Sequence, residues 1–185
     1  RMRKEEIYSE HDLEWRDDVS GRTVREGDRI DLGGIEVSIL EIPGHSSCCI
    51  AAYVPELKAL FPTDGGGIPF DETIVTSGNS NFTRYQEGLE RLKDLEVENY
   101  CADHYGYVIG EEARKFIPLT IEMAKRKRAE MEEAYRSTRD IDAAAKKLIS
   151  SFYDENPDYF LSPDIFLDVH RQMVRHIASV MEQKA

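Results

Sequence analysis

Three short segments each place a side chain that can bind a metal ion beside glycine, after an apolar run. His45 follows Pro-Gly, Asp64 precedes three glycines that are expected to leave one side open, and His104 lies in an Asp-His-Tyr-Gly turn. Hydrolytic metal sites use imidazole and carboxylate ligands at about 2.0–2.2 Å from the ion. A carboxylate can also bridge two cations, with one oxygen on each. The residue types predict a metal site, although each turn taken singly is also typical of a polar loop.

Strand-like runs come before all three turns, over residues 35–42, 58–61 and 97–101. The first of them alternates apolar and polar side chains, as a half-buried strand does. Strand ends suit metal ligands, because the sheet fixes the backbone while the loop exposes the side chain. We therefore expect the three side chains to converge, although they lie far apart along the chain. The carboxylate of Asp103 could contact one of the imidazole rings and hold its orientation.

The sequence changes character near residue 110, where long helical patterns with few breakers replace short strands. The earlier part also predicts strands over residues 29–32 and 50–54 and a helix over 82–95, whereas residues 70–80 carry no period. Three helices are expected afterwards, over 111–135, about 140–153 and about 163–182. Pro118 falls inside the first, so that this helix either restarts there or kinks.

The other histidines are weaker candidates for metal ligands. His170 and His176 lie six positions apart on the last predicted helix, and therefore roughly 120° apart around it. They cannot chelate one ion as an i, i+4 pair does. We expect a histidine on the helix surface and another in the C-terminal turn. His11 has two acidic neighbours but no second histidine nearby.

Composition limits the partners. The 185 residues carry a net charge of −12, from 24 basic and 36 acidic side chains. Such a chain repels phosphate backbones, so nucleic acid is not an expected partner, and the basic run at 125–128 is expected to be a solvated helix face. No apolar stretch approaches the roughly 20 residues that span a bilayer, so no membrane partner is expected. Three cysteines make a poor disulfide framework and indicate a reducing, cytoplasmic compartment.

The segments from about Glu26 to Gly110 resemble the metallo-β-lactamase superfamily in their order and spacing. The shared features are a Leu-Gly-Gly hairpin, a strand into Pro-Gly-His-Ser, an apolar run into Asp-Gly, and a final Asp-His-Tyr-Gly. The resemblance implies an α/β fold in which residues 1–110 form half of an αββα sandwich. Residues 111–185 would form a C-terminal helical extension packed on it.

The resemblance also implies the roles of the three ligands. His45 would bind the first metal, Asp64 would bridge both, and His104 would bind the second. We expect both divalent ions to be zinc, and iron or manganese are the alternatives. Tyr105 and Tyr107 are the expected substrate contacts.

The implied reaction is attack by a metal-bound hydroxide on the carbonyl of a small ester, thioester or lactone. The family's remaining ligands come from a His-x-His-x-Asp-His segment upstream, which residues 1–42 do not contain. We therefore expect the N-terminal half of the fold to be missing from this chain and to be its partner; a homodimer is left open. The alternatives are a non-catalytic relative that acts as a binding module, or a redox di-iron or RNA-cleaving relative.

Overall fold

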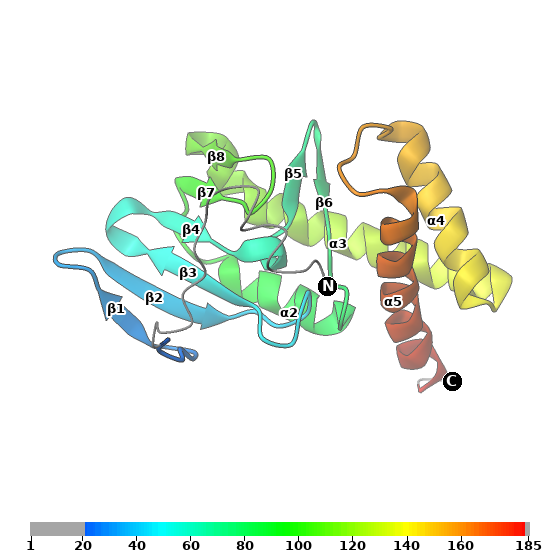
Figure 1. Cartoon of the computed structure of the whole chain (residues 1–185), viewed down its shortest axis with the longest axis horizontal. Helices are drawn as coiled ribbons and strands as arrows, with labels where there is room; N and C mark the ends of the chain where they lie inside the picture. The colour runs from blue at the N-terminus through cyan, green and yellow to red at the C-terminus, as the bar shows by residue number, and fades with distance from the viewer. Residues whose placement is uncertain (1–20, 184–185) are drawn as a thin grey trace, which may run out of the picture.

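The computed structural model describes residues 21–183, and His11 lies outside them. These residues form a sheet region followed by three long helices (Figure 1). The strands of the main sheet are β1 (Arg29–Asp31), β2 (Glu36–Glu41), β3 (Ile50–Val54), β4 (Ala59–Phe61), β7 (Asn99–Cys101) and β8 (Tyr107–Ile109). The predicted strands are confirmed, and β8 is an addition to them.

Three strands of this sheet run in the same direction and end at the same edge. The strand order is β1-β2-β3-β4-β7-β8. β2 and β4 each pair antiparallel with β3, and β4 pairs parallel with β7, with Leu60 opposite Tyr100. The carboxyl ends of β2, β4 and β7 therefore meet. The loops that follow them carry His45, Asp64 and His104.

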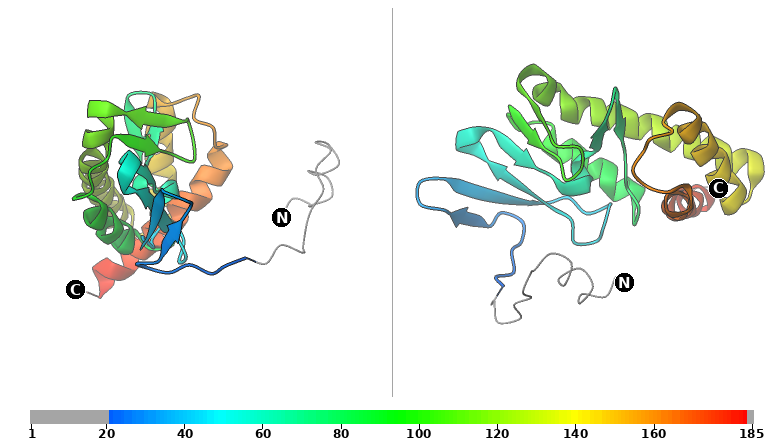
Figure 2. Two further views of the ribbon diagram at one scale, coloured as in Figure 1. Left: turned by 90° about the vertical axis from the view of Figure 1, so that its left-hand side faces the viewer. Right: turned by 45° about the horizontal axis from the view of Figure 1, so that its top comes forward.

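Two helices, α2 (Phe82–Leu92) and α3 (Gly110–Thr138), lie on one side of the sheet (Figures 1 and 2). Leu60 and Tyr100 point to that side and are fully buried in the main core. Pro118 neither ends nor restarts α3, which continues as one helix of 29 residues. The apolar stripes of the helices therefore cover one face of the sheet.

The opposite face of the sheet is not covered by any helix within residues 21–183. Strand pairing places Phe61, Tyr107 and Ile109 on that side, where they are 45%, 72% and 57% exposed. The helix-covered face is filled with core residues, whereas this face mixes buried side chains, such as Ile39 and Val54, with these exposed ones. This matches one half of an αββα sandwich.

A short hairpin separates the sheet from the last two helices. It consists of β5 (Ile68–Phe70) and β6 (Thr73–Val75), in a segment where the sequence indicated no element. Beyond it lie α4 (Ile141–Glu155) and α5 (Pro163–Glu182), close to their predicted bounds. Phe70 and Val75 of the hairpin share an apolar cluster with Phe166 of α5.

The prediction that His170 lies on the helix surface is wrong. Its side chain is buried and only 1% exposed, because it shares the inner face of α5 with Phe166 and Met173. His176 is half-buried, and its Nε2 lies 3.1 Å from the hydroxyl of Thr83.

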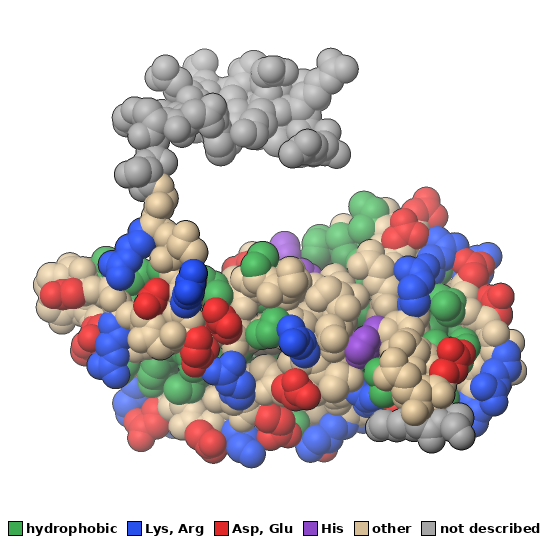
Figure 3. Space-filling model, turned by 90° about the horizontal axis from the view of Figure 1, so that it is seen from below, with side chains coloured by type: hydrophobic (Ala, Val, Ile, Leu, Met, Phe, Trp, Pro, Cys, Tyr) green, Lys and Arg blue, Asp and Glu red, His purple; other side chains and the backbone are tan. Residues whose placement is uncertain are grey.

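The surface mixes both charges. Basic and acidic side chains are interspersed over the face in Figure 3, with no continuous basic tract on it. Among the described helices, none is both long and apolar enough to cross a bilayer. The three cysteines, Cys48, Cys49 and Cys101, are free thiols, and Cys48 is exposed.

Candidate metal centre

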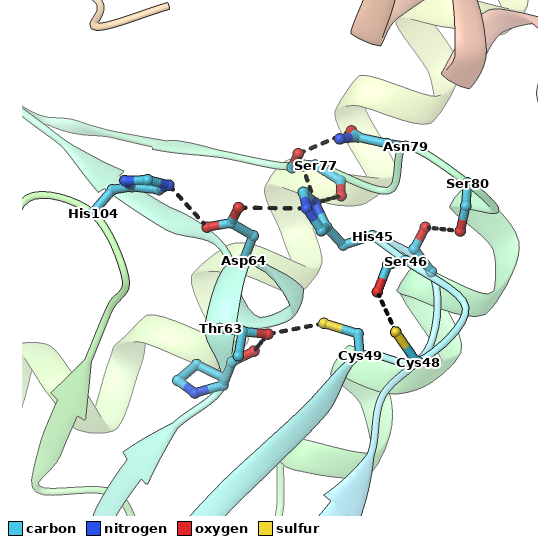
Figure 4. A network of polar contacts seen from close by, with 12 residues as sticks. His45, Ser46, Cys48, Cys49, Thr63, Asp64, Ser77, Asn79, Ser80 and His104 are labelled. Carbon is cyan, nitrogen blue, oxygen red and sulfur yellow. Dashed lines mark hydrogen bonds and ion pairs between the residues drawn. The ribbon is translucent and has the colours of Figure 1, made fainter. Parts of the chain in front are cut away.

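The three predicted ligands converge at the shared strand edge (Figure 4). Nε2 of His45 lies 3.5 Å from one carboxylate oxygen of Asp64. Nε2 of His104 lies 3.6 Å from the other oxygen. The spatial prediction is therefore confirmed: one carboxylate presents a separate oxygen to each of two imidazoles.

The turn that carries His45 depends on glycine at position 44. Gly44 has φ +149°, and a Cβ added there would lie 2.3 Å from the backbone nitrogen of Tyr85. The Gly44 carbonyl accepts hydrogen bonds from the backbone N–H groups of Ser80 and Asn81, at 3.0 and 2.9 Å. This turn is thus seated directly against the start of α2, where no side chain fits.

Asp64 is held by a buried 3₁₀ turn, Thr63–Gly66, rather than by an open loop. A Cβ on Gly66 would lie 2.4 Å from Cγ of Pro62 and 2.6 Å from the Tyr100 hydroxyl. Thr63 has φ +51°, a left-handed conformation that β-branched residues rarely adopt. The glycines therefore allow close packing around Asp64; the expectation of an open side is wrong for this turn.

A neighbour fixes the tautomer of His45. Its Nδ1 lies 2.9 Å from the backbone carbonyl oxygen of Ser77 and 3.1 Å from the Ser77 hydroxyl oxygen, whose own hydrogen is donated to Asn79 at 2.9 Å. A carbonyl oxygen only accepts, so Nδ1 carries the hydrogen. In the neutral imidazole, Nε2 then turns a lone pair toward the carboxylate of Asp64. Two acceptors face each other favourably only with a proton or a cation between them.

The charge of Asp64 has no strong partner. No lysine or arginine forms an ion pair with it in the part of the chain that the structure describes, and its Oδ1 is buried without a hydrogen-bond donor. Burial raises the pKa of Tyr85 and of Tyr100, and the negative charge of Asp64 raises both further. Within the described residues no lysine or arginine would therefore compete with a cation for the carboxylate of Asp64.

His104 is supported from the helical region. Its ring stacks on Phe160, which lies between α4 and α5, at 4.7 Å between centroids. The backbone N–H of Phe160 donates to the hydroxyl of Tyr105 at 3.1 Å. Asp103, expected as an orienting group, makes no hydrogen bond or ion pair within residues 21–183. Tyr107 lies on β8, and 72% of its surface is exposed.

Comparison with known proteins finds relatives over part of the chain. No family model matches the sequence. Curated relatives named hydroxyacylglutathione hydrolase include one from Hyphomonas neptunium, 32% identical over 91 residues, which are 45% of this chain and 32% of the relative. Another, from Rhizobium meliloti, is 46% identical over 64 residues, 32% of this chain and 25% of the relative.

Solved structures share the fold. A metallo-β-lactamase family protein from Thermus thermophilus aligns with a TM-score of 0.63 at 14% identity, over 97% of this chain and 58% of that one. A β-lactamase domain protein from Burkholderia ambifaria gives the same TM-score at 15% identity, over 88% of this chain and 47% of that one. The chain therefore shares the fold of metallo-β-lactamase family proteins. It spans about a third or less of the length of the two curated relatives.

The residues present match the two-ion site predicted from the sequence only in part. No group of three or more His, Cys, Asp or Glu side chains within residues 21–183 is arranged to hold a single ion. The arrangement instead offers two pairs, His45 with Asp64 and His104 with Asp64. Bound ions would therefore need further ligands in addition to these.

Sequence reasoning missed two supporting residues, Ser77 and Phe160. Ser77 lies in a run of small polar residues, Thr76 to Ser80, for which no period was found. In the structure Ser77 is distinguished as a supporting residue by its burial, with only 8% of its surface exposed. Burial of a loop residue cannot be predicted from one sequence. Phe160 is a large apolar side chain, a type that is most often buried in the core. The structure leaves it 46% exposed beside His104.

Proposed function

We propose that this protein is a metal-dependent hydrolase of a small thioester, and that His45, Asp64 and His104 are ligands of its two-ion site. The observation that carries the proposal is the pair of imidazole nitrogens at 3.5 and 3.6 Å from separate oxygens of Asp64. The relatives named hydroxyacylglutathione hydrolase support hydrolysis. They also make a hydroxyacyl thioester of glutathione the first substrate to test.

The chain's own residues have distinct tasks in this proposal. Divalent ions in such a site supply a nucleophile at neutral pH and Lewis acidity. Ser77 keeps the hydrogen of His45 on Nδ1, which leaves Nε2 free to bind an ion, as backbone carbonyls do for many metal-binding histidines. Tyr105 is 49% exposed and follows His104 in the chain, which supports a role in contacting substrate, and we propose the same role for Tyr107.

We further propose that the uncovered sheet face packs against a second layer of the same fold, which supplies the remaining ligands. The exposed apolar residues of that face support this partner, because large apolar side chains gathered on one face mark an interaction surface. Phe61, Tyr107 and Ile109 are the largest of them.

Replacing one of these residues tests the second layer. In the protein expressed from its complete reading frame, Ile109→Lys should lower the free energy of unfolding by more than about 2 kcal/mol, because it would bury a charge. Leu119→Lys is the matched control, since Leu119 is similarly exposed at 53% but lies on α3. Equal, small effects of both substitutions would show that the sheet face is free.

Thioester hydrolysis tests the activity itself. The complete protein, loaded with zinc, should hydrolyse the glutathione thioester, and Asp64→Asn should lower kcat/KM more than about 100-fold, because the amide cannot bridge two cations. Asp103→Asn is the control, since it makes the same change one residue before His104. Near wild-type turnover in Asp64→Asn would reject the assigned role.

The second candidate is a non-catalytic binding module. One observation favours it: within the described residues no complete single-ion ligand group exists. A zinc-loaded wild-type protein without thioester, ester or lactone hydrolysis would support this alternative over the enzyme.

A further inference from the structure

Two exposed aromatic rings, Tyr105 and Phe160, form an aromatic pair beside the candidate metal centre. The ring of Phe160 stacks on that of His104 at 4.7 Å between centroids, and the ring of Tyr105 packs edge-on against Phe160 at 5.6 Å. Both rings are about half exposed. They lie in loops next to a proposed ligand, and not on strands of the uncovered sheet face. Exposed apolar side chains that touch one another mark a surface for binding another molecule.

The aromatic pair is held in place from several elements. The backbone N–H of Phe160 donates to the hydroxyl of Tyr105 at 3.1 Å, which joins the two loops. Tyr105 also packs on Phe70 of β5 at 5.0 Å between centroids, and Phe160 packs on the buried Tyr159 at 4.9 Å. Tyr105 has φ +61°, a conformation that bulky residues rarely adopt. Rings that are fixed in this way lose little conformational entropy when they bind a ligand.

The chain segments at the site carry negative charge and no basic side chain. Neither lysine nor arginine occurs in the segments with the three candidate ligands and the aromatic pair, which are residues 44–49, 62–81, 101–110 and 156–166. The acidic residues in these segments are Asp64, Asp71, Glu72, Asp103, Asp158 and Asp164. Within residues 21–183, none of them forms an ion pair with lysine or arginine. Beyond the ions themselves, an anionic group of a substrate would therefore meet like charge and no cationic partner here.

We propose that the aromatic pair binds an uncharged aromatic group of the thioester substrate, and that Phe160 makes the site select such substrates. This inference rests on the proposed function, because it names the class of thioester that the hydrolase accepts. Aromatic rings bind other rings in stacked and edge-to-face arrangements, and the exposed parts of both rings offer such contacts. A glutathione thioester is then a substrate only with its carboxylates turned away from the aromatic pair.

Two matched pairs of neutral thioesters test the proposal with the complete, zinc-loaded protein. The first pair consists of the phenylacetyl and acetyl thioesters of N-acetylcysteamine. The second pair consists of the acetyl thioesters of 2-phenylethanethiol and ethanethiol. In one of the pairs, kcat/KM should favour the aromatic member about tenfold or more, which also shows whether the acyl or the thiol side meets the rings. A carboxylate added to the ring of the preferred substrate should lower kcat/KM about threefold or more.

A variant assigns the preference to Phe160. Phe160→Ala should reduce the ratio of the two kcat/KM values to about threefold or less. The ratio is the readout, because a weaker zinc site slows both members of a pair alike. Ile165→Ala removes another exposed apolar side chain, 56% exposed on α5, and should keep the wild-type ratio.

The outcomes separate this inference from the proposed function. If none of the thioesters is hydrolysed, the proposed function is rejected, and this inference with it. Hydrolysis without an aromatic preference in either pair overturns this inference alone. The same holds for a wild-type ratio in Phe160→Ala, or for a ring carboxylate that leaves kcat/KM unchanged.

Discussion

The sheet region and the helical region hold their parts together in different ways. Up to residue 110, some neighbouring atoms approach so closely that only glycine fits: Gly44 lies against the backbone of Tyr85, and Gly66 lies against the side chains of Pro62 and Tyr100. After residue 110 the sequence contains no glycine, and apolar stripes on long helices do the packing. The candidate ligands all lie in the first region. The candidate ligands therefore lie where close contacts to glycine leave no room for a Cβ, whereas the helices rely on side-chain packing that can adjust.

The largest expected effect tests the close backbone approach. Gly44→Ala should cost more than about 4 kcal/mol in the free energy of unfolding, or prevent folding, because its Cβ would meet backbone atoms of Tyr85 that cannot move aside. Chemical denaturation monitored by circular dichroism measures this.

Gly34→Ala provides the control for backbone strain. Gly34 also has a positive φ, +106°, but no atom lies within 4 Å of an added Cβ. Its substitution should cost only about 1–2 kcal/mol. Similar costs at both positions would show that conformation alone, rather than the approach to α2, limits the turn that carries His45.

A smaller effect tests the helical region through pH. Burial lowers the pKa of His170 to about 3 in the folded protein, whereas the unfolded chain has the ordinary value near 6.5. Below pH 6.5 the unfolded chain therefore binds a proton at His170 that the folded protein does not bind. Stability is then lost as pH falls from 6.5 toward 3, by about 1.4 kcal/mol per pH unit. In urea unfolding, wild type should lose about 2 kcal/mol more than His170→Phe between pH 6.5 and 5. Parallel losses in the two proteins would contradict the buried, neutral state of His170.

The smallest effect concerns the contact between the two regions. Phe160→Ala removes the ring that stacks on His104, and should weaken zinc binding about 3- to 10-fold in competition with a chelating dye. Ile165→Ala is the control, since Ile165 is 56% exposed on α5 and makes no stacking contact. Equal zinc affinities in the two variants would show that the helical region does not support the site.

Strand direction explains why the site could be predicted from the sequence. His45, Asp64 and His104 each follow a strand with a clear apolar pattern, and parallel alignment of those strands brings their ends together. The β5–β6 hairpin escaped prediction because its strands have three residues each, too few to show a period, and one of them contains Pro69.

His170 shows a signal that was present but not used. It lies four residues after Phe166 and three before Met173, the spacing of one buried helix face. The expectation of a surface histidine rested on the angle between His170 and His176 alone, and not on this apolar stripe. Ser77 is different, because its contact with His45 depends on how a loop folds back, and local sequence does not encode that contact.

Zinc titration of the complete protein tests most directly whether Asp64 is shared by two half-sites. Wild type should bind two equivalents. His45→Ala should weaken one of them and His104→Ala the other, whereas Asp64→Asn should weaken both. If Asp64→Asn keeps both zinc affinities of the wild type, the carboxylate does not join the two imidazoles into one metal centre.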